Sequence, residues 1–254
     1  MGFYNTEALI LKARDWGEAD RLVTLFSRDK GKLVAVAKGL RKPQSKLRGG
    51  VQVLSRSELM LHTGRSLDRI TGSQSIHGFD LGDSLDKLTC GMYWADLLDR
   101  ILPEREANPP IYELAMKSLA GLEASDSGRF PLEAFSLFFE WNLINLMGYQ
   151  PCLDCCVLCR EPLEPERERE FNFSAGEGGL LCRSCSPGTD GRVRLTAPTL
   201  AILRRWSAIS FNHFNRIAVS PASRQEINTV VESVLLYHLE RDLPSRGFLN
   251  RLGG

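Results

Sequence analysis

The sequence predicts an α+β protein in which a small β-barrel is followed by a helical domain. Short apolar and β-branched segments separated by turn residues occupy the start of the chain. Apolar residues recur at helical spacing after residue 79. Three C-x-x-C motifs lie within this helical part, two of them adjacent in sequence. We therefore expect two domains, residues 1–79 and 80–254, with a cysteine module inserted at about residues 150–190 of the second.

The barrel is expected to contain five strands. The segments rich in apolar and β-branched residues are 7–14, 21–26, 32–37, 51–61 and 67–76. Turn sequences around Gly17, Gly31 and Gly64 separate several of them. Five short strands in one short stretch favour a closed barrel, because closure leaves no strand edge unpaired.

Three helices are expected before the cysteine motifs. The first keeps its helical spacing of apolar residues until Pro103. The second starts at Asn108, which places Pro109 at the first helical position, where a missing N–H costs nothing. The third follows Pro131 and is apolar except for a thin polar stripe. A helix of this kind is expected at the buried centre of its domain.

Two more helices are expected after the cysteines, one from near Thr196 and one from near Ser220. Ser223 and Glu226 have the spacing of a capping box at the start of the last helix. His238 lies near the end of that helix among apolar residues, and we expect it in the core rather than in an active site.

Composition narrows the class of protein. The hydrophobic fraction of 43% and the charged fraction of 25% are ordinary for a globular chain. A net charge of +1 means that any attraction to phosphate must come from local charge. No apolar run approaches bilayer-spanning length, and an export signal is absent, so the expected location is the cytosol. Thiols stay reduced there, and the seven cysteines therefore indicate metal or redox chemistry.

The cysteines form two matched knuckles, Cys156-x-x-Cys159 and Cys182-x-x-Cys185. Each C-x-x-C turn delivers two thiolates, and two turns complete the tetrahedral shell of one structural zinc ion. The glycines at 178–179 indicate a short hairpin that carries the second knuckle. A catalytic zinc would keep an open position, and a redox C-x-x-C usually stands alone beside a βαβ unit.

An alternative first knuckle is present. Cys152 and Cys155 have the same spacing and could replace Cys156 and Cys159. Arg160 also occupies a position where many knuckles have glycine. We favour the pair at 156 and 159, which makes the other two cysteines additional thiols.

Positive residues concentrate between residues 28 and 56, where only Asp29 opposes them. They are Arg28, Lys30, Lys32, Lys38, Arg41, Lys42, Lys46, Arg48 and Arg56. The loop 39–50 can follow a phosphate backbone, with an affinity that depends on salt through counterion release. The alternative is a solvated charged loop. Trp16 and Phe26 are the candidates for base stacking, although either could belong to the core.

Four segments, taken together, carry a resemblance to a known family. They read EALILKARDWGEADRLVTLFSRDKGKLVAVAKGLRKPQSKLRG, FEWNLINLMGYQPCLDCCVLC, GGLLCRSC and LERDLPSRGFLNRL. In this order they resemble the RecO family of bacterial recombination mediators. The resemblance implies an N-terminal OB-fold and a helical C-terminal domain with a zinc module. The zinc cysteines would be Cys156, Cys159, Cys182 and Cys185. The basic DNA-binding positions would be Lys38, Arg41, Lys42, Lys46 and Arg48. Cys152 and Cys155 depart from the family pattern.

The resemblance also implies a function without catalysis. RecO proteins bind single- and double-stranded DNA, anneal complementary strands and work with RecR to help RecA replace the single-stranded-DNA-binding protein, SSB. The implied location is the bacterial cytoplasm, in association with the nucleoid. The acidic, apolar SSB tail is expected on the helical domain, where Arg204, Arg205 and Arg216 flank helices.

Two alternative functions compete with this one. An enzyme, such as a nuclease with a zinc ribbon, is disfavoured because the four histidines are scattered and no H-E-x-x-H or Walker motif is present. A zinc-ribbon adaptor that binds only protein partners is the second alternative, and strand annealing would separate it from a mediator.

Overall fold

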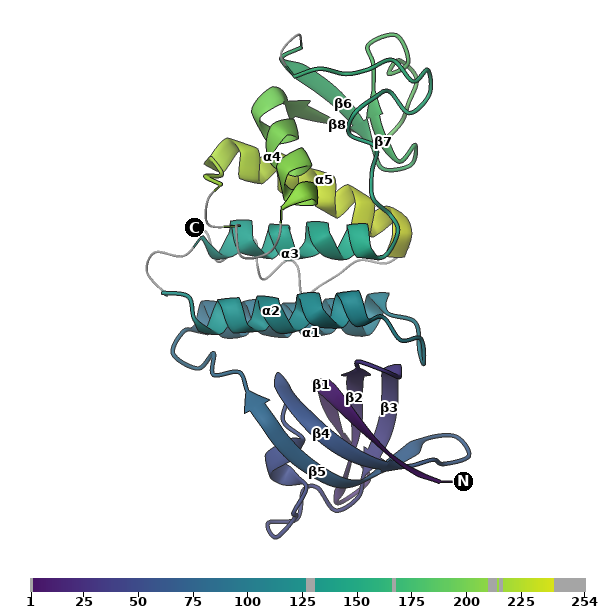
Figure 1. Ribbon diagram of the computed structural model, residues 1–254, viewed down its shortest axis with the longest axis vertical. Helices are drawn as coiled ribbons and strands as arrows, with labels where there is room; N and C mark the ends of the chain where they lie inside the picture. Colours follow the sequence, from purple (N-terminus) through teal and green to yellow (C-terminus); the bar gives the residue numbers. More distant parts are fainter. Residues whose placement is uncertain (1, 127–130, 166–167, 210–213, 215–216, 240–254) are drawn as a thin grey trace. The chain divides into compact units, whose positions relative to one another are not determined.

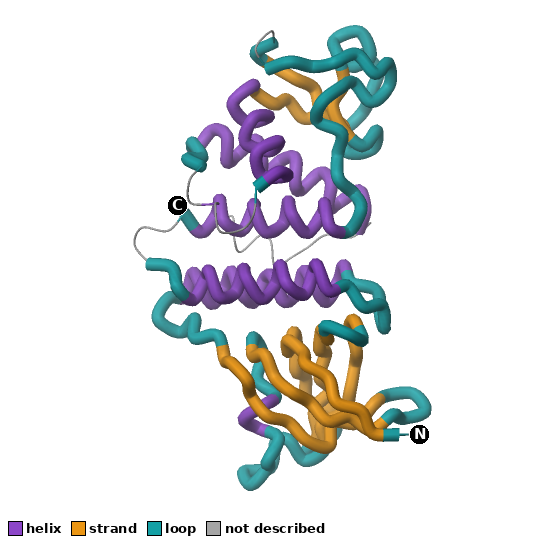
Figure 2. The backbone as a smooth tube through the Cα atoms, in the orientation of Figure 1, coloured by secondary structure: helices purple, strands orange, loops and turns teal. Residues whose placement is uncertain are grey.

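The computed structural model describes residues 2–126, 131–165, 168–209, 214 and 217–239. The described chain forms two compact units, one up to residue 126 and one from residue 131. Figure 1 follows the order of the elements by colour, and Figure 2 separates helices from strands. The sequence boundary expected at residue 79 lies within the first unit, because two helices pack with the barrel. The division into domains of residues 1–79 and 80–254, with a zinc module at about 150–190, therefore stays a prediction.

Five strands form the closed barrel. They are β1 (Phe3–Trp16), β2 (Asp20–Ser27), β3 (Gly31–Ala37), β4 (Ser55–His62) and β5 (Asp68–Gly78). Their order around the barrel is β1-β2-β3-β5-β4, with β3 and β5 parallel and β4 returning to pair with β1. This is the five-stranded arrangement of an OB-fold, and the predicted fold class of the N-terminal part is confirmed.

One strand boundary differs from the expectation. Strand β4 begins at Ser55 and not at residue 51. Leu54 has a φ of 61°, a left-handed conformation that interrupts extended backbone just before the strand. Val51 nevertheless packs in the barrel core, so its apolar character reports burial and not strand conformation.

Helices α1 (Leu85–Ile101) and α2 (Pro109–Glu123) complete the first unit. The Asn108 side chain accepts a hydrogen bond from the Ile111 backbone N–H at 3.2 Å, with Pro109 in the first turn as predicted. Tyr112 of α2 packs edge-on against buried Phe26 at 5.6 Å between ring centroids. Its hydroxyl donates to Glu7 of β1 at 3.0 Å. These contacts attach α2 to the barrel.

The second unit contains α3 (Leu132–Leu146), α4 (Ala197–Ala208) and α5 (Pro221–Leu239). The second unit also contains a three-stranded antiparallel sheet. Its strands lie in the order β7 (Gly179–Leu181), β6 (Glu170–Ser174), β8 (Arg192–Thr196). Helix α3 is buried on most sides, as expected for the centre of a domain. Even two residues of its polar stripe, Ser136 and Glu140, are buried, and they share a hydrogen bond of 3.2 Å.

Two expectations about α5 are wrong. The Ser220 hydroxyl accepts the hydrogen bond from the Ser223 backbone N–H, so Ser223 is not the cap of a box with Glu226. The Glu226 carboxylate instead accepts from the backbone N–H and hydroxyl of Thr196 at 2.9 and 3.0 Å, which fixes the start of α4. His238 is exposed, with its ring stacked on Tyr149 at 3.8 Å, and does not lie in the core.

No helix among the described residues is both long and apolar enough to span a membrane.

Candidate metal centre and nucleic-acid interface

The second unit brings four cysteines together at the end of its small sheet. Within the described residues, the Sγ atoms of Cys156, Cys159, Cys182 and Cys185 all lie within 4.8 Å of one another. Cys182 directly follows β7, and the predicted hairpin of β6 and β7 thus carries the second knuckle. Four sulfur donors at such separations fit a closed tetrahedral metal shell.

Backbone hydrogen bonds shape each knuckle. The Arg160 N–H donates to the Cys156 carbonyl at 2.9 Å, and the Ser186 N–H donates to the Cys182 carbonyl at 3.0 Å. Arg160 has a φ of 66°, the left-handed conformation for which glycine is the usual residue. The turn therefore forms with arginine at a conformational cost of about 1–2 kcal/mol.

The tendency to ionise differs between two thiols of this group, Cys156 and Cys185. Burial raises the pKa of the Cys156 thiol, but the backbone N–H groups of Cys159 and Cys182 outweigh this and bring the pKa down to about 6. Hydrogen bonds with the Cys182 and Cys159 thiols raise the pKa of Cys185 to about 12. The clustered thiols thus oppose ionisation of Cys185 while the backbone favours ionisation of Cys156. A dication would remove this conflict by stabilising all four thiolates.

Cys152 and Cys155 lie outside this group of four. Their Sγ atoms are 3.5 Å from each other. The backbone of Cys152 instead joins the two knuckle segments: its N–H donates to the Gly178 carbonyl, and its carbonyl accepts from the Leu180 N–H, both at 2.9 Å. The structure thus brings together the cysteines that the sequence analysis preferred and sets the alternative pair apart.

Gly179 permits this joint between the two knuckle segments. It has a φ of 157°, and a Cβ at this position would overlap the backbone of Cys152. We expect Gly179→Ala to lower both the melting temperature and metal retention. Gly178→Ala is the matched control, because Gly178 also has a positive φ but no heavy atom near the Cβ position. Thermal unfolding and metal analysis of both variants would test this, and equal effects would contradict a role for the close approach.

Arg204 is a supporting residue whose role the sequence did not indicate. Its guanidinium donates to the Leu153 carbonyl at 2.6 and 3.1 Å and to the Leu163 carbonyl at 2.8 Å. These bonds tie α4 to the loop that carries the first knuckle. The Arg204 guanidinium is therefore engaged in hydrogen bonds within the fold, although the sequence placed it among the arginines near the expected SSB-tail site. Arg216, expected at the same site, lies outside the described residues.

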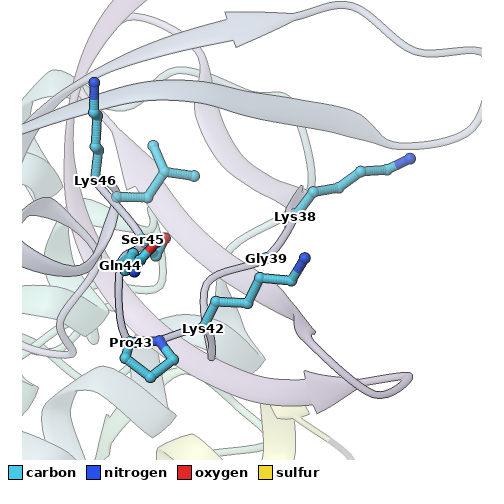
Figure 3. Close-up of a pocket in the computed structure, with 8 residues that line it drawn as sticks. Lys38, Gly39, Lys42, Pro43, Gln44, Ser45 and Lys46 are labelled. Atoms are coloured by element: carbon cyan, nitrogen blue, oxygen red, sulfur yellow. The ribbon is translucent and has the colours of Figure 1, made fainter.

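The first unit presents the predicted basic residues on the loop between β3 and β4. The side chains of Lys38, Arg41, Lys42, Lys46 and Arg48 are all exposed. The three lysines line a surface pocket of about 630 Å³ together with Gly39, Pro43, Gln44, Ser45 and Leu47. Figure 3 shows the lysine side chains extending from separate points around this loop. The pocket offers ammonium groups, a hydroxyl and an amide, the groups that bind phosphate oxygens.

The loop is ordered despite its exposed charge. Successive turns close it, with Lys42 N–H bonded to the Gly39 carbonyl at 3.1 Å and Ser45 N–H to the Lys42 carbonyl at 3.0 Å. Leu40 is buried in the barrel core, and Leu47 packs against that core. The backbone that carries Lys42 and Lys46 is therefore attached to the barrel at both ends.

Other cations of the basic segment have structural partners. The Lys32 ammonium turns inward and donates to the Asp99 carbonyl of α1. Arg56 makes two hydrogen bonds to Glu7, at 2.8 and 2.9 Å. Arg41 differs from the pocket lysines because it lies 3.5 Å from an Asp15 carboxylate oxygen and donates to the Glu18 carbonyl at 3.2 Å. The structure thereby distinguishes the three pocket lysines from Arg41, while Arg48 is exposed and does not line the pocket.

Comparison with known families agrees with this architecture. The model of the Recombination protein O N-terminal domain matches residues 1–79, and that of the C-terminal domain matches residues 82–247. The chain belongs to the RecO family. The resemblance found in the sequence is therefore confirmed, although residues 240–252 of its last segment lie outside the described structure.

Relatives of this RecO-family chain match it along its full length. The DNA repair protein RecO of Pelotomaculum thermopropionicum is 34% identical over 100% of this chain and 96% of its own. That of Desulforamulus reducens is 32% identical over 99% and 96%. That of Symbiobacterium thermophilum is 29% identical over 99% and 98%. Membership in this family of DNA repair proteins supports a role in recombinational repair.

Proposed function

We propose that this RecO-family chain is a recombination mediator that binds DNA and catalyses no reaction. The ordered pocket of Lys38, Lys42 and Lys46 on an OB-fold is the observation that carries the proposal. OB-folds commonly bind single strands in a positively charged groove. The exposed ammonium groups suit phosphates, which every sequence presents, so the pocket favours binding to single- and double-stranded DNA without sequence preference.

The proposed metal is one structural zinc ion per chain. Cys156, Cys159, Cys182 and Cys185 would hold it, since tetrahedral sulfur ligation is typical of structural zinc. The ion would join the two knuckles and stabilise the second unit. Four thiolates leave no open coordination position for substrate, and this favours a structural role over a catalytic one.

The proposed partners follow from the family. Besides DNA, they are RecR, the SSB C-terminal tail on the helical part of the chain and, indirectly, RecA, in the cytoplasm at the nucleoid. Through these contacts the chain would hold SSB while it handles the strand that SSB releases. Binding of a labelled SSB tail peptide to the intact chain tests this partner. If the peptide does not bind, SSB is not a partner of the chain.

Strand annealing by the purified full chain tests the proposed function. Complementary oligonucleotides coated with SSB should anneal faster in its presence, without any nucleotide cofactor. Addition of RecR should then raise RecA loading on the coated strand. A zinc-ribbon adaptor that binds only protein would neither anneal strands nor bind free DNA, and that outcome would replace the proposal.

A further inference from the structure

One tryptophan is exposed at the end of the strand whose partner strand bonds to the basic loop. The four tryptophans of the chain all lie within the described residues, and three of them, Trp94, Trp141 and Trp206, are at most 1% exposed. Trp16 is 49% exposed. Phe26, the other aromatic residue considered for stacking, is fully buried in the first unit. Trp16 is thus a large flat ring that the fold leaves in solvent.

The strand register directs Trp16 toward the basic loop. Trp16 at the end of β1 pairs with Asp20 at the start of β2. Directly paired residues have side chains on the same face of a sheet. The Asp20 carboxylate accepts a hydrogen bond of 2.7 Å from the Gly39 N–H, and Gly39 lines the lysine pocket. Trp16 therefore projects from the same sheet face as the Asp20 carboxylate that bonds to Gly39 of the basic loop.

Further bonds hold the hairpin and the loop together. The Arg41 N–H donates to the Ala19 carbonyl at 3.0 Å, and the Arg41 side chain reaches the Glu18 carbonyl. These residues form the turn between β1 and β2. The segments that carry Trp16 and the pocket lysines are consequently joined to each other by hydrogen bonds.

This pairing of a ring with cations distinguishes two forms of DNA. Lysines bind phosphates of single strands and duplexes alike. An external ring can stack only on a base that is free to turn outward, and duplex bases are already stacked and paired. A nucleotide whose phosphate lies in the pocket can present its base to a neighbouring ring.

We propose that Trp16 stacks on a base of DNA whose phosphates occupy the lysine pocket, and that this contact sets a preference for single strands over duplexes. The inference rests on the proposed DNA binding and adds the residue that selects the strand form. Stacking on one aromatic residue changes affinity by about tenfold.

Intrinsic fluorescence of the full chain tests the contact directly, because the other three tryptophans are buried. Oligothymidylate should change the Trp16 emission, and a duplex at equal occupancy should not. Trp16→Phe serves as the control, since it removes the exposed fluorophore but keeps an aromatic ring. Any emission change that survives in this variant arises from the buried tryptophans.

Binding of labelled oligonucleotides completes the test. Trp16→Ala should weaken single-strand binding about tenfold, leave duplex binding and the salt dependence unchanged, and be largely rescued by Trp16→Phe. Equal losses for both DNA forms, or unchanged Trp16 emission on a bound single strand, would overturn the stacking proposal alone. Failure of the unaltered chain to bind either form would overturn the proposed DNA binding as well.

Discussion

Cys182→Ser is expected to release the proposed zinc ion and to lower the melting temperature of the second unit. Cys182 is buried directly after β7, and its Sγ lies 3.7 Å from that of Cys159. Replacing its thiol therefore removes one of the four sulfur ligands. Zinc binding to four cysteines contributes on the order of 10 kcal/mol to small domains. Removal of one ligand should therefore cost several kcal/mol, more than the roughly 1 kcal/mol of an average substitution.

Cys152→Ser is the matched control for this experiment. The thiol of Cys152 lies outside the group of four, and its contribution to the joint is made by backbone atoms that serine retains. The variant should keep its full metal content and nearly unchanged stability. Elemental analysis and thermal unfolding measure both properties. Comparable metal loss in the two variants would show that the first knuckle has been assigned to the wrong pair.

Lys42→Ala combined with Lys46→Ala is expected to weaken DNA binding and to reduce its salt dependence. Both ammonium groups belong to the pocket on the barrel, and each bound phosphate releases counterions. The slope of log affinity against log salt should flatten by roughly 0.7 for each single-strand phosphate that the variant no longer neutralises. Unrelated sequences should be affected alike, because ammonium groups bound to phosphates do not distinguish bases.

The combination Lys12→Ala with Lys117→Ala removes the same charge from exposed positions of the same unit. These lysines lie on β1 and α2, away from the basic loop in the sequence. Fluorescence anisotropy of labelled oligonucleotides across a range of salt concentrations compares the two double variants. An equal change of slope would mean that net charge, and not the pocket, determines the affinity.

Much of the architecture could be read from local sequence patterns. Apolar alternation identified the five barrel strands, and Pro109 after Asn108 marked the start of α2, because strand pairing and helix starts depend on residues close together in the chain. The errors concern residues whose partners are distant. Glu226 had the spacing of a local cap but bonds to Thr196, and His238 lies at an apolar position of α5 but is exposed.

The sequence by itself determined the fold class, the family and the presence of two cysteine knuckles, since each follows from residue type and short-range spacing. Tertiary structure decided which cysteines meet, because Cys155 and Cys156 are neighbours in sequence and only their packing against the β6–β7 hairpin separates their roles. It also sorted the cations, turning Lys32 to a helix carbonyl and leaving Lys42 exposed. The positions of charged residues can be read from the sequence. Whether such a side chain can bind a ligand depends on the partners that folding brings to it from distant segments.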